Sequence, residues 1–164
     1  GKSLPRAVSL PGSRARGVTS FMRCVVLLAG PPGAGKTTAA RQSGLAVFDR
    51  DDEGWLGEKH FRSAIEELRE MEDARAVVIR SAAGSHSRRK WARRIGATHT
   101  FLLWHEREVL ASRVVRRGRQ DSQNSLAAIH QWFDLFDHDD QCPIFRDWGA
   151  VFGDSIGRVS ARFS

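Results

Sequence analysis

Apolar and polar positions between residues 23 and 136 form blocks that switch between two periods. Four short apolar runs, rich in β-branched residues, have the composition of buried strands, at residues 23–30, 45–49, 76–80 and 98–104. Segments with helical spacing follow each run, at residues 36–42, 58–71, 87–96, 106–118 and 125–136. Alternation of strands and helices predicts a parallel sheet covered on both faces. We therefore expect a three-layer α/β fold with a sheet of about four to five strands.

The two ends of the chain lack this pattern. Residues 1–21 mix Pro, Gly, Ser and Arg without any period, which predicts a basic, disordered arm. The 164 residues suit one domain, which we place at residues 22–147. From Trp148 onward no element can be assigned, so residues 148–164 are left as a tail of undetermined order.

The net charge of +7 is concentrated at the N-terminus. Residues 1–23 hold five basic residues and no acid, whereas residues 24–164 hold 21 basic and 19 acidic residues, so the body carries only +2. Attraction of a polyanion would therefore depend on the arm or on local patches. The sequence shows no apolar run of membrane length and no signal peptide, and Cys24 and Cys142 lie far apart. We expect a cytoplasmic protein with two thiols and no membrane contact; the oligomeric state stays open.

One glycine-rich segment carries the strongest chemical signal. Residues 30–37, GPPGAGKT, fit G-x-x-x-x-G-K-[ST] at every fixed position, between an expected strand and an expected helix. Such a loop turns its N–H groups toward phosphate oxygens, while the lysine reaches the β- and γ-phosphates and the Thr hydroxyl binds Mg²⁺. The sequence predicts an ATP and Mg²⁺ site, with Thr37 on the metal and the nucleotide held by Gly30, Pro31, Pro32, Gly33, Ala34, Gly35, Lys36, Thr37 and Thr38.

Acidic residues follow the second expected strand directly. The segment DRDDE, Asp49 to Glu53, comes where the carboxyl ends of parallel strands line a ligand crevice. A carboxylate there can accept the proton of an acceptor hydroxyl; the alternative is a solvated acidic loop. The chain also lacks the guanine-reading NKxD of a GTPase and the apolar strand ending in Asp-Glu of a motor ATPase. These features favour a kinase.

Two further segments are rich in arginine. Arg113 and Arg117 share a helix face and can close over a triphosphate, unless they simply form an exposed basic helix end. The segment from Arg88 to Arg94 resembles a nucleic-acid patch with Trp91 for stacking. Equally, Trp91 and Ile95 could form a buried stripe with arginines on the wet face.

These motifs together resemble the bacteriophage polynucleotide 5′-kinase family of small P-loop kinases. The resemblance covers Val25 to about Phe136 and includes the loop, FDRDD and SRRKWARRIGA. It implies that Asp51 is the general base and that Arg113 and Arg117 are lid arginines on the donor phosphates. The family's acceptor-binding arginine corresponds to Gly54, and its Asp-Thr-Asn after the third strand corresponds to Ser81, Ala82 and Ala83. Substitutes for the lost phosphate contact would be Arg50 and Arg80.

The expected function is transfer of the γ-phosphate of ATP to a hydroxyl of a nucleic acid or nucleotide. The catalytic candidates are Lys36, Asp51, Arg113 and Arg117, and the acceptor candidates are Asp49, Arg50, Asp51 and Arg80. The first choice of acceptor is a polynucleotide 5′-hydroxyl; the alternatives are a hydroxymethylated base in DNA, a nucleoside or a nucleoside monophosphate. A different class of function is a non-catalytic, nucleotide-responsive module that binds DNA through the arm and the Arg88–Arg94 segment.

Two other clusters favour structural roles. His138, Asp139, Asp140 and Cys142 lie close in sequence but have no second ligand group nearby, so we do not expect a metal site there. Trp132, Phe133 and Phe136 recur with helical spacing, which indicates core rather than base stacking.

Overall fold

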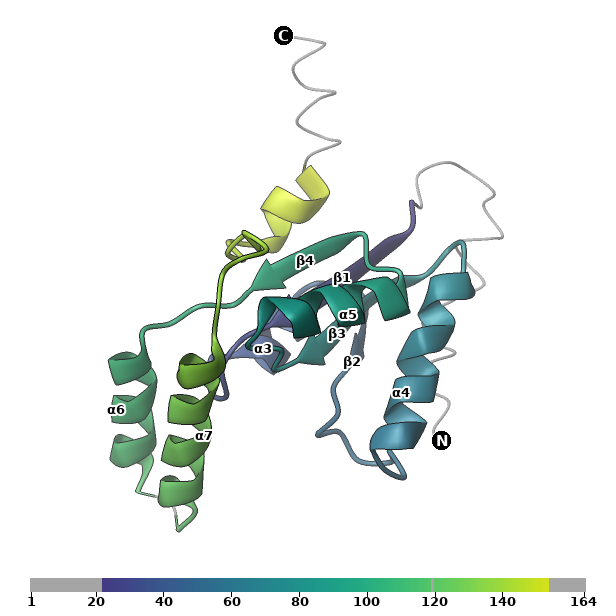
Figure 1. The fold of residues 1–164 in the computed structure, drawn as a ribbon. Coiled ribbons are helices and arrows are strands. Elements are labelled where there is room, and N and C mark those ends of the chain that lie inside the picture. The colour runs from purple at the N-terminus through teal and green to yellow at the C-terminus, as the bar shows by residue number, and fades with distance from the viewer. Residues whose placement is uncertain (1–21, 119, 154–164) are drawn as a thin grey trace, which may run out of the picture.

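Four parallel strands form the centre of the structure, a computed structural model that describes residues 22–118 and 120–153 (Figure 1). The strands are β1 (Cys24–Ala29), β2 (Ala46–Phe48), β3 (Arg75–Arg80) and β4 (His99–Leu102), in the spatial order β2-β3-β1-β4. Every pairing is parallel, as expected for strands linked by helical crossovers. The predicted α/β fold with about four to five strands is confirmed. The expected arm of residues 1–21 and the last residues, 154–164, lie outside the described part of the chain.

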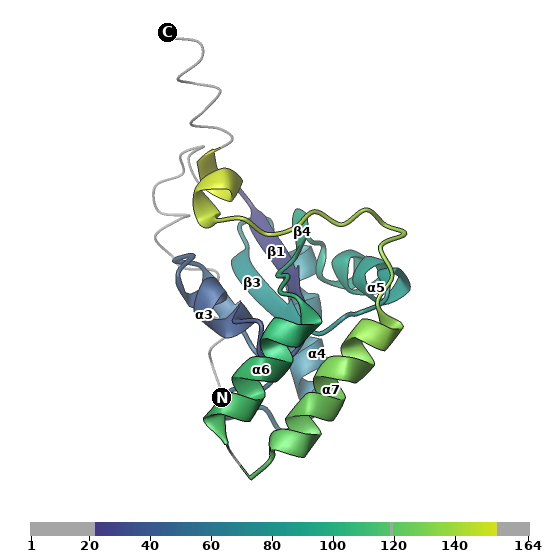
Figure 2. The same cartoon turned by 90° about the vertical axis from the view of Figure 1, so that its left-hand side faces the viewer.

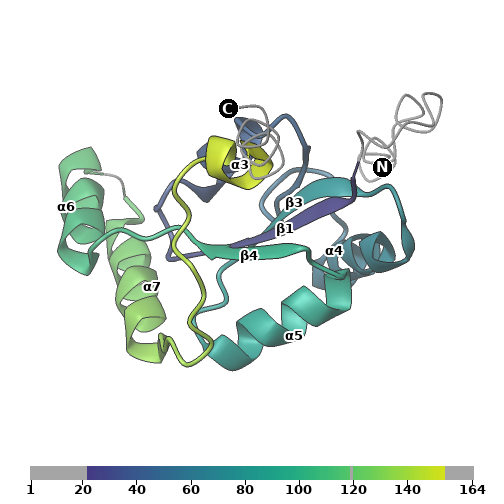
Figure 3. The ribbon, with the colours of Figure 1, turned by 90° about the horizontal axis from the view of Figure 1, so that it is seen from above.

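One face of the sheet is covered by three helical elements. These are α4 (Glu58–Glu66), the 3₁₀-helix η1 (Glu67–Glu70) and α5 (Ser85–Ile95). Phe61 and Ile65 of α4 and Trp91 and Ile95 of α5 pack with inward residues of the strands in one apolar cluster. Figure 3 shows α4 and α5 on the same side of the sheet, opposite α3 (Lys36–Arg41). The expected helix of residues 58–71 is thus an α-helix that tightens into a 3₁₀ turn.

The other face is covered by α3 and by a short helix at residues 148–153 (Figure 3). Trp148 and Val151 pack with Ala40 and the outward residues of β1, and the Trp148 indole donates to the main-chain oxygen of Ala39 at 2.6 Å. The fold therefore continues past residue 147, where the predicted domain ended. Six residues form fewer than two helical turns, too few to show a helical period, so sequence periodicity could not detect this helix.

A helical hairpin stands beside the sheet. It consists of α6 (Arg107–Arg117) and α7 (Ser122–Leu135), which run antiparallel in Figures 1 and 2. Leu110 and Val114 of α6 and Ile129 of α7 pack against Ala34 of the glycine-rich loop. The hairpin is therefore anchored on the loop that the sequence singles out.

Arg23 has a structural role that its place in the basic N-terminal segment concealed. Its guanidinium donates to the main-chain oxygens of Met71, Gly96, Leu68 and Ile95, at 3.0, 2.5, 2.8 and 3.3 Å. These oxygens belong to the ends of η1 and α5, where helical carbonyls lack partners within the helix. Arg23 therefore fixes two helix ends and is not a free charge of the arm.

Candidate functional site

The glycine-rich loop, residues 30–37, connects the end of β1 to the start of α3. Gly35 is the N-cap residue of α3 with φ of 92°, a left-handed conformation that glycine adopts without strain. Gly30 passes so close to β4 that a Cβ built on it would lie 2.6 Å from the main-chain oxygen of Leu103. The backbone path of the loop thus depends on glycine at both positions.

Lys36 lies against the inside of this loop. Its ammonium donates to the main-chain oxygens of Gly30 and Pro31. Burial lowers the pKa of Lys36 to about 8, and the nearby carboxylates of Asp49 and Asp51 limit the decrease. A partly dehydrated ammonium against this loop is suited to bind an anion, because an anion restores the electrostatic stabilisation that burial removes.

Thr37 and Asp49 join the loop to the acidic segment. The Thr37 hydroxyl donates to Oδ2 of Asp49 at 2.5 Å, and Asp49 is only 6% exposed. Oδ1 of Asp49 accepts from the N–H of Asp51 at 3.0 Å, and the Asp49 main-chain oxygen accepts from the Trp55 indole at 3.0 Å. A buried carboxylate and a hydroxyl in contact are hard oxygen donors, which fit Mg²⁺. Among the described residues, no group of three or more His, Cys, Asp or Glu could hold a metal by itself, so the fit is to a metal that arrives with phosphate.

A pocket of about 300 Å³ opens between the loop and the ends of β2 and β3; we call it the β2–β3 pocket. Six of its nine lining residues belong to the predicted set, namely Pro32, Lys36, Asp49, Arg50, Asp51 and Arg80. The remaining three are Glu58, Ile79 and Ser81. The structure therefore brings the predicted donor lysine, the predicted base and the predicted acceptor residues to one cavity.

Glu58 is the residue of this pocket that sequence reasoning missed. It is the first residue of α4. Its carboxylate accepts hydrogen bonds from Arg80 at 2.8 and 3.5 Å and from Arg62 at 2.9 Å, and forms an ion pair with Arg50 at 3.4 Å. Hydrogen bonds from Arg80 and Arg62 lower the pKa of Glu58. The only local signal is the i, i+4 pair with Arg62; the contact with Arg80 spans 22 residues of sequence.

Arg80 is held from three sides. Its guanidinium carbon lies 4.3 Å from the centre of the Trp91 ring and 5.4 Å from that of Phe61, in addition to the Glu58 contact. Such stacking orients the guanidinium plane. Arg80 therefore presents a fixed positive charge at the wall of the β2–β3 pocket.

Arg113 and Arg117 lie on α6 and do not line the β2–β3 pocket. Arg117 lies beside a small cavity of about 30 Å³ between α6 and α7. Within the described ranges, neither side chain has a hydrogen bond or an ion pair. The hairpin's packing on Ala34 places both arginines on an element that contacts the loop, but the structure does not bring them together with Lys36 and Asp51.

Two residues of the basic helix α5, Arg88 and Trp91, are buried. Arg88 is 1% exposed and donates to the main-chain oxygens of Ala82, Ala83 and Asp137, at 3.0, 2.7 and 2.5 Å, and to both Asp140 oxygens at 2.7 and 2.8 Å. Trp91 is 5% exposed in the core. Of the two alternatives, burial excludes Arg88 and Trp91 from a nucleic-acid patch, and Arg88 holds the loop that follows β3.

That loop, residues 81–84, forms the floor of a second cavity, which we call the α5–α7 cavity. Its volume is about 530 Å³, and Ser81, Ala82, Ala83, His86 and Gln131 are among its lining residues. It shares Pro32 and Ser81 with the β2–β3 pocket, so the two cavities adjoin. Small side chains at residues 82 and 83 leave this space open.

Trp132 closes the wall of the α5–α7 cavity from α7. Its indole donates to the main-chain oxygen of Ser81 at 2.7 Å, and its ring packs with Trp104, Phe133 and Phe136. Trp132 is 4% exposed, so the prediction that these aromatics belong to the core is confirmed for Trp132, with the two phenylalanines packed around it.

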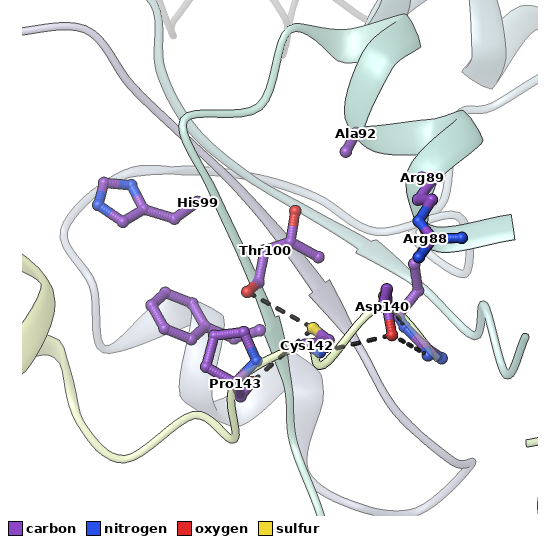
Figure 4. A pocket seen from close by; sticks show the side chains of 9 residues that line it. Arg88, Arg89, Ala92, His99, Thr100, Asp140, Cys142 and Pro143 are labelled. Atoms are coloured by element: carbon purple, nitrogen blue, oxygen red, sulfur yellow. Dashed lines mark hydrogen bonds and ion pairs between the residues drawn. The ribbon is translucent and has the colours of Figure 1, made fainter. Parts of the chain in front are cut away.

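A third cavity, of about 460 Å³, lies between α5, β4 and residues 140–143. Figure 4 shows Arg88 directed at Asp140 at one end and Cys142 beside Thr100. His138 pairs with the main-chain oxygen of Cys142 at 2.6 Å, and Asp140 is engaged by Arg88. Cys24 and Cys142 are both free and buried, as expected.

Comparison with known proteins supports the fold and adds no activity. No protein-family model and no curated protein matches the chain. Among the solved structures that are similar is the crystal structure of APE1195, with a TM-score of 0.53 and 16% sequence identity, over 86% of this chain and 97% of that one. At this identity the likeness concerns the fold alone. No helix in the described ranges is long and apolar enough to cross a membrane.

Proposed function

We propose that the chain is an ATP- and Mg²⁺-dependent kinase that phosphorylates a hydroxyl of a nucleic acid or nucleotide. One observation carries the proposal: Lys36, the Thr37–Asp49 pair and Asp51 line or adjoin a single cavity beside a loop of P-loop sequence. A lysine for phosphate, oxygen donors for a metal and a carboxylate for a proton are the groups that phosphoryl transfer requires.

Each residue has a defined task in this proposal. The P-loop amides and Lys36 bind the β- and γ-phosphates, and Thr37, supported by Asp49, holds Mg²⁺. Bound nucleotide supplies the phosphoryl group: its bond to the ADP oxygen breaks as a bond to the acceptor oxygen forms. Asp51, exposed at the pocket, accepts the proton of the acceptor hydroxyl. Arg113 and Arg117 would stabilise the transferred charge if the hairpin brought them over the phosphates.

The first choice of acceptor is the 5′-hydroxyl of a polynucleotide. The fixed guanidinium of Arg80, with Arg50 on the same pocket, supports an acceptor that carries phosphate near its hydroxyl. A hydroxymethylated base in DNA, a nucleoside and a nucleoside monophosphate are the other acceptors to compare.

The deciding experiment is transfer of labelled γ-phosphate from ATP with Mg²⁺ to these acceptors, with Lys36→Ala as the inactive control. Asp51→Asn should lower the rate by roughly 10²–10⁴-fold, as expected for loss of a general base, and leave ATP affinity unchanged. Glu53→Gln, an exposed acid two residues away, is the matched control and should keep full activity. Full activity of Asp51→Asn would overturn the assignment of the base. ATP binding without transfer to any acceptor would favour the nucleotide-responsive DNA-binding module.

A further inference from the structure

The solvent-facing side of α5 is basic along its whole length. His86, Arg89, Lys90 and Arg93 recur at i, i+3, i+4 and i+7, which places them on one side of the helix. The opposite side, with Arg88, Trp91 and Ile95, is buried. The helix contains no acidic residue.

Most of the exposed charge on α5 is not neutralised. Arg94 forms an ion pair with Glu66 at 3.4 Å and Arg88 forms one with Asp140, so the charges of these two arginines are neutralised. Among the residues that the structure describes, Arg89 donates to a main-chain oxygen alone, that of Asp139, at 3.4 Å. The ammonium of Lys90 lies 5.1 Å from the centre of the Trp91 ring without a carboxylate partner among the described residues.

Arg93 is exposed and has neither a hydrogen bond nor an ion pair from its side chain within the described ranges. Three cations therefore follow one another on the outer side of the helix. One exposed acid, Asp139, lies at the end where α5 begins and is the negative group that opposes them there.

The basic side of α5 begins at the cavity next to the β2–β3 pocket. His86 lines the α5–α7 cavity, which shares Ser81 and Pro32 with the pocket that holds Lys36 and Asp51. In Figure 3, α5 forms an outer layer of the molecule, with its first turn toward α7. From His86 to Arg93 the helix rises about 10 Å, at 1.5 Å per residue.

We propose that a single nucleic-acid strand bearing the acceptor hydroxyl leaves the β2–β3 pocket through the α5–α7 cavity and follows the outer side of α5. The phosphates contact Arg89, Lys90 and Arg93, and the first sugar and base lie against the apolar wall formed by Trp132 and Leu135. The proposal rests on the proposed kinase for the position of the hydroxyl. It selects a polynucleotide over a free nucleoside or mononucleotide.

The test measures binding and transfer with Arg89→Gln/Arg93→Gln, both exposed positions remote from the β2–β3 pocket. The control is Arg116→Gln/Arg146→Gln, which removes the same charge from other exposed sites. Binding of a fluorescent 12-nucleotide single strand is followed by anisotropy over a range of salt concentrations. Each lost phosphate contact should reduce the slope of log K against log salt by roughly 0.7, so the α5 variant should lose about 1.4 and the control nothing. Asp139→Asn should strengthen binding.

Transfer kinetics supply the second readout. The KM for the 12-nucleotide acceptor should increase at least about tenfold in the α5 variant, while the KM for a nucleoside 3′-phosphate should not change. Equal slopes in the α5 and control variants, or equal effects on the long and short acceptors, would overturn the path. If no acceptor is phosphorylated, the kinase proposal fails, and the anisotropy slopes still decide whether α5 binds the strand.

Discussion

The donor side and the acceptor side of the β2–β3 pocket are built in different ways. On the donor side, the main polar contacts lie within residues 30–37: Gly35 caps α3 and Lys36 contacts carbonyls five and six residues back. On the acceptor side, the shape of the loop after β3 depends on Arg88, whose partner Asp140 is 52 residues away. A locally determined site tolerates change elsewhere, whereas an assembled site fails when one distant contact is lost.

The largest effect should come from the hydrogen bonds and the ion pair of Arg88 on the acceptor side, which we call the clamp. Arg88→Met keeps the side-chain length but leaves the Asp140 carboxylate and the oxygens of Ala82, Ala83 and Asp137 without their donor. Breaking a buried ion pair on one side costs about 3–5 kcal/mol. Urea unfolding of the variant should show a loss in this range. Arg89→Met, one residue along and exposed, should change the free energy of unfolding by less than about 0.5 kcal/mol; equal losses would mean that the clamp is not the cause.

The same contrast explains what the sequence could predict. The order of strands and helices and the glycine-rich loop follow from local composition and spacing, and the structure has them. Asp49, Arg50 and Asp51 could be placed beside Lys36 because parallel strands end at one edge of a sheet. Arg88 shares the helix face of Trp91 and Ile95, but an arginine there looked like a surface charge because its partner, Asp140, lies 52 residues away.

Contacts between distant segments also explain why the sequence did not predict the role of Glu58 or the helix at residues 148–153. Glu58 shows one local pair, and its role in the β2–β3 pocket arises only when β3 brings Arg80 beside it. The Trp148 helix rests on a hydrogen bond that spans 109 residues. Sequence periodicity reports which side of an element is apolar, but it does not report which polar group meets which partner.

The contact between the two sides is the next point to test. Thr37→Val removes the hydroxyl that donates to Asp49 and preserves the shape of the side chain. Under the proposed function the Mg²⁺ concentration for half-maximal ATP binding should rise at least about 10–100-fold, the range for partners that only orient a metal ligand, because Thr37 is itself the proposed ligand. Thr37→Ser, which keeps the hydroxyl, is the control and should remain near wild type. Titration of a fluorescent ATP analogue with Mg²⁺ measures this concentration for both variants. If Thr37→Val and Thr37→Ser behaved alike, the Thr37 hydroxyl would not be a ligand of the metal.

On the donor side, Lys36 predicts a pH dependence of nucleotide binding. Its pKa of about 8 is lowered by burial, and a bound triphosphate should raise it again, so binding above pH 8 takes up a proton. ATP affinity should be constant below pH 7 and fall by up to about tenfold per pH unit above pH 8. Calorimetry in buffers of different ionisation enthalpy measures the proton uptake directly. Lys36→Arg, which stays charged, should remove the dependence; if the dependence persisted in this variant, another group would be responsible.

The smallest effect should come from Glu58. Glu58→Gln removes the charge that three arginines share, but all of these pairs are partly exposed. Each ion pair of this kind contributes at most about 1 kcal/mol to the free energy of unfolding, and part of the loss is recovered because the amide still accepts a hydrogen bond. Thermal unfolding at pH 7 should therefore show a small decrease in Tm. Glu70→Gln, whose one ion pair within residues 22–118 and 120–153 is the exposed pair with Arg69, should show none.

The pH dependence of the difference in Tm between the wild type and Glu58→Gln tests whether Glu58 pairs with Arg80 at the β2–β3 pocket. Arg80 and Arg62 lower the pKa of Glu58 in the folded chain, so its contribution is present above the pKa of the unfolded state and is lost as pH falls through the folded one. The wild type and Glu58→Gln should differ at pH 6–7 and converge below about pH 4. A difference that stayed constant down to pH 3 would show that Glu58 acts through packing rather than charge. If Glu58 acts through packing, Glu58→Gln would keep Arg80 in its wild-type position, ready to contact an acceptor phosphate.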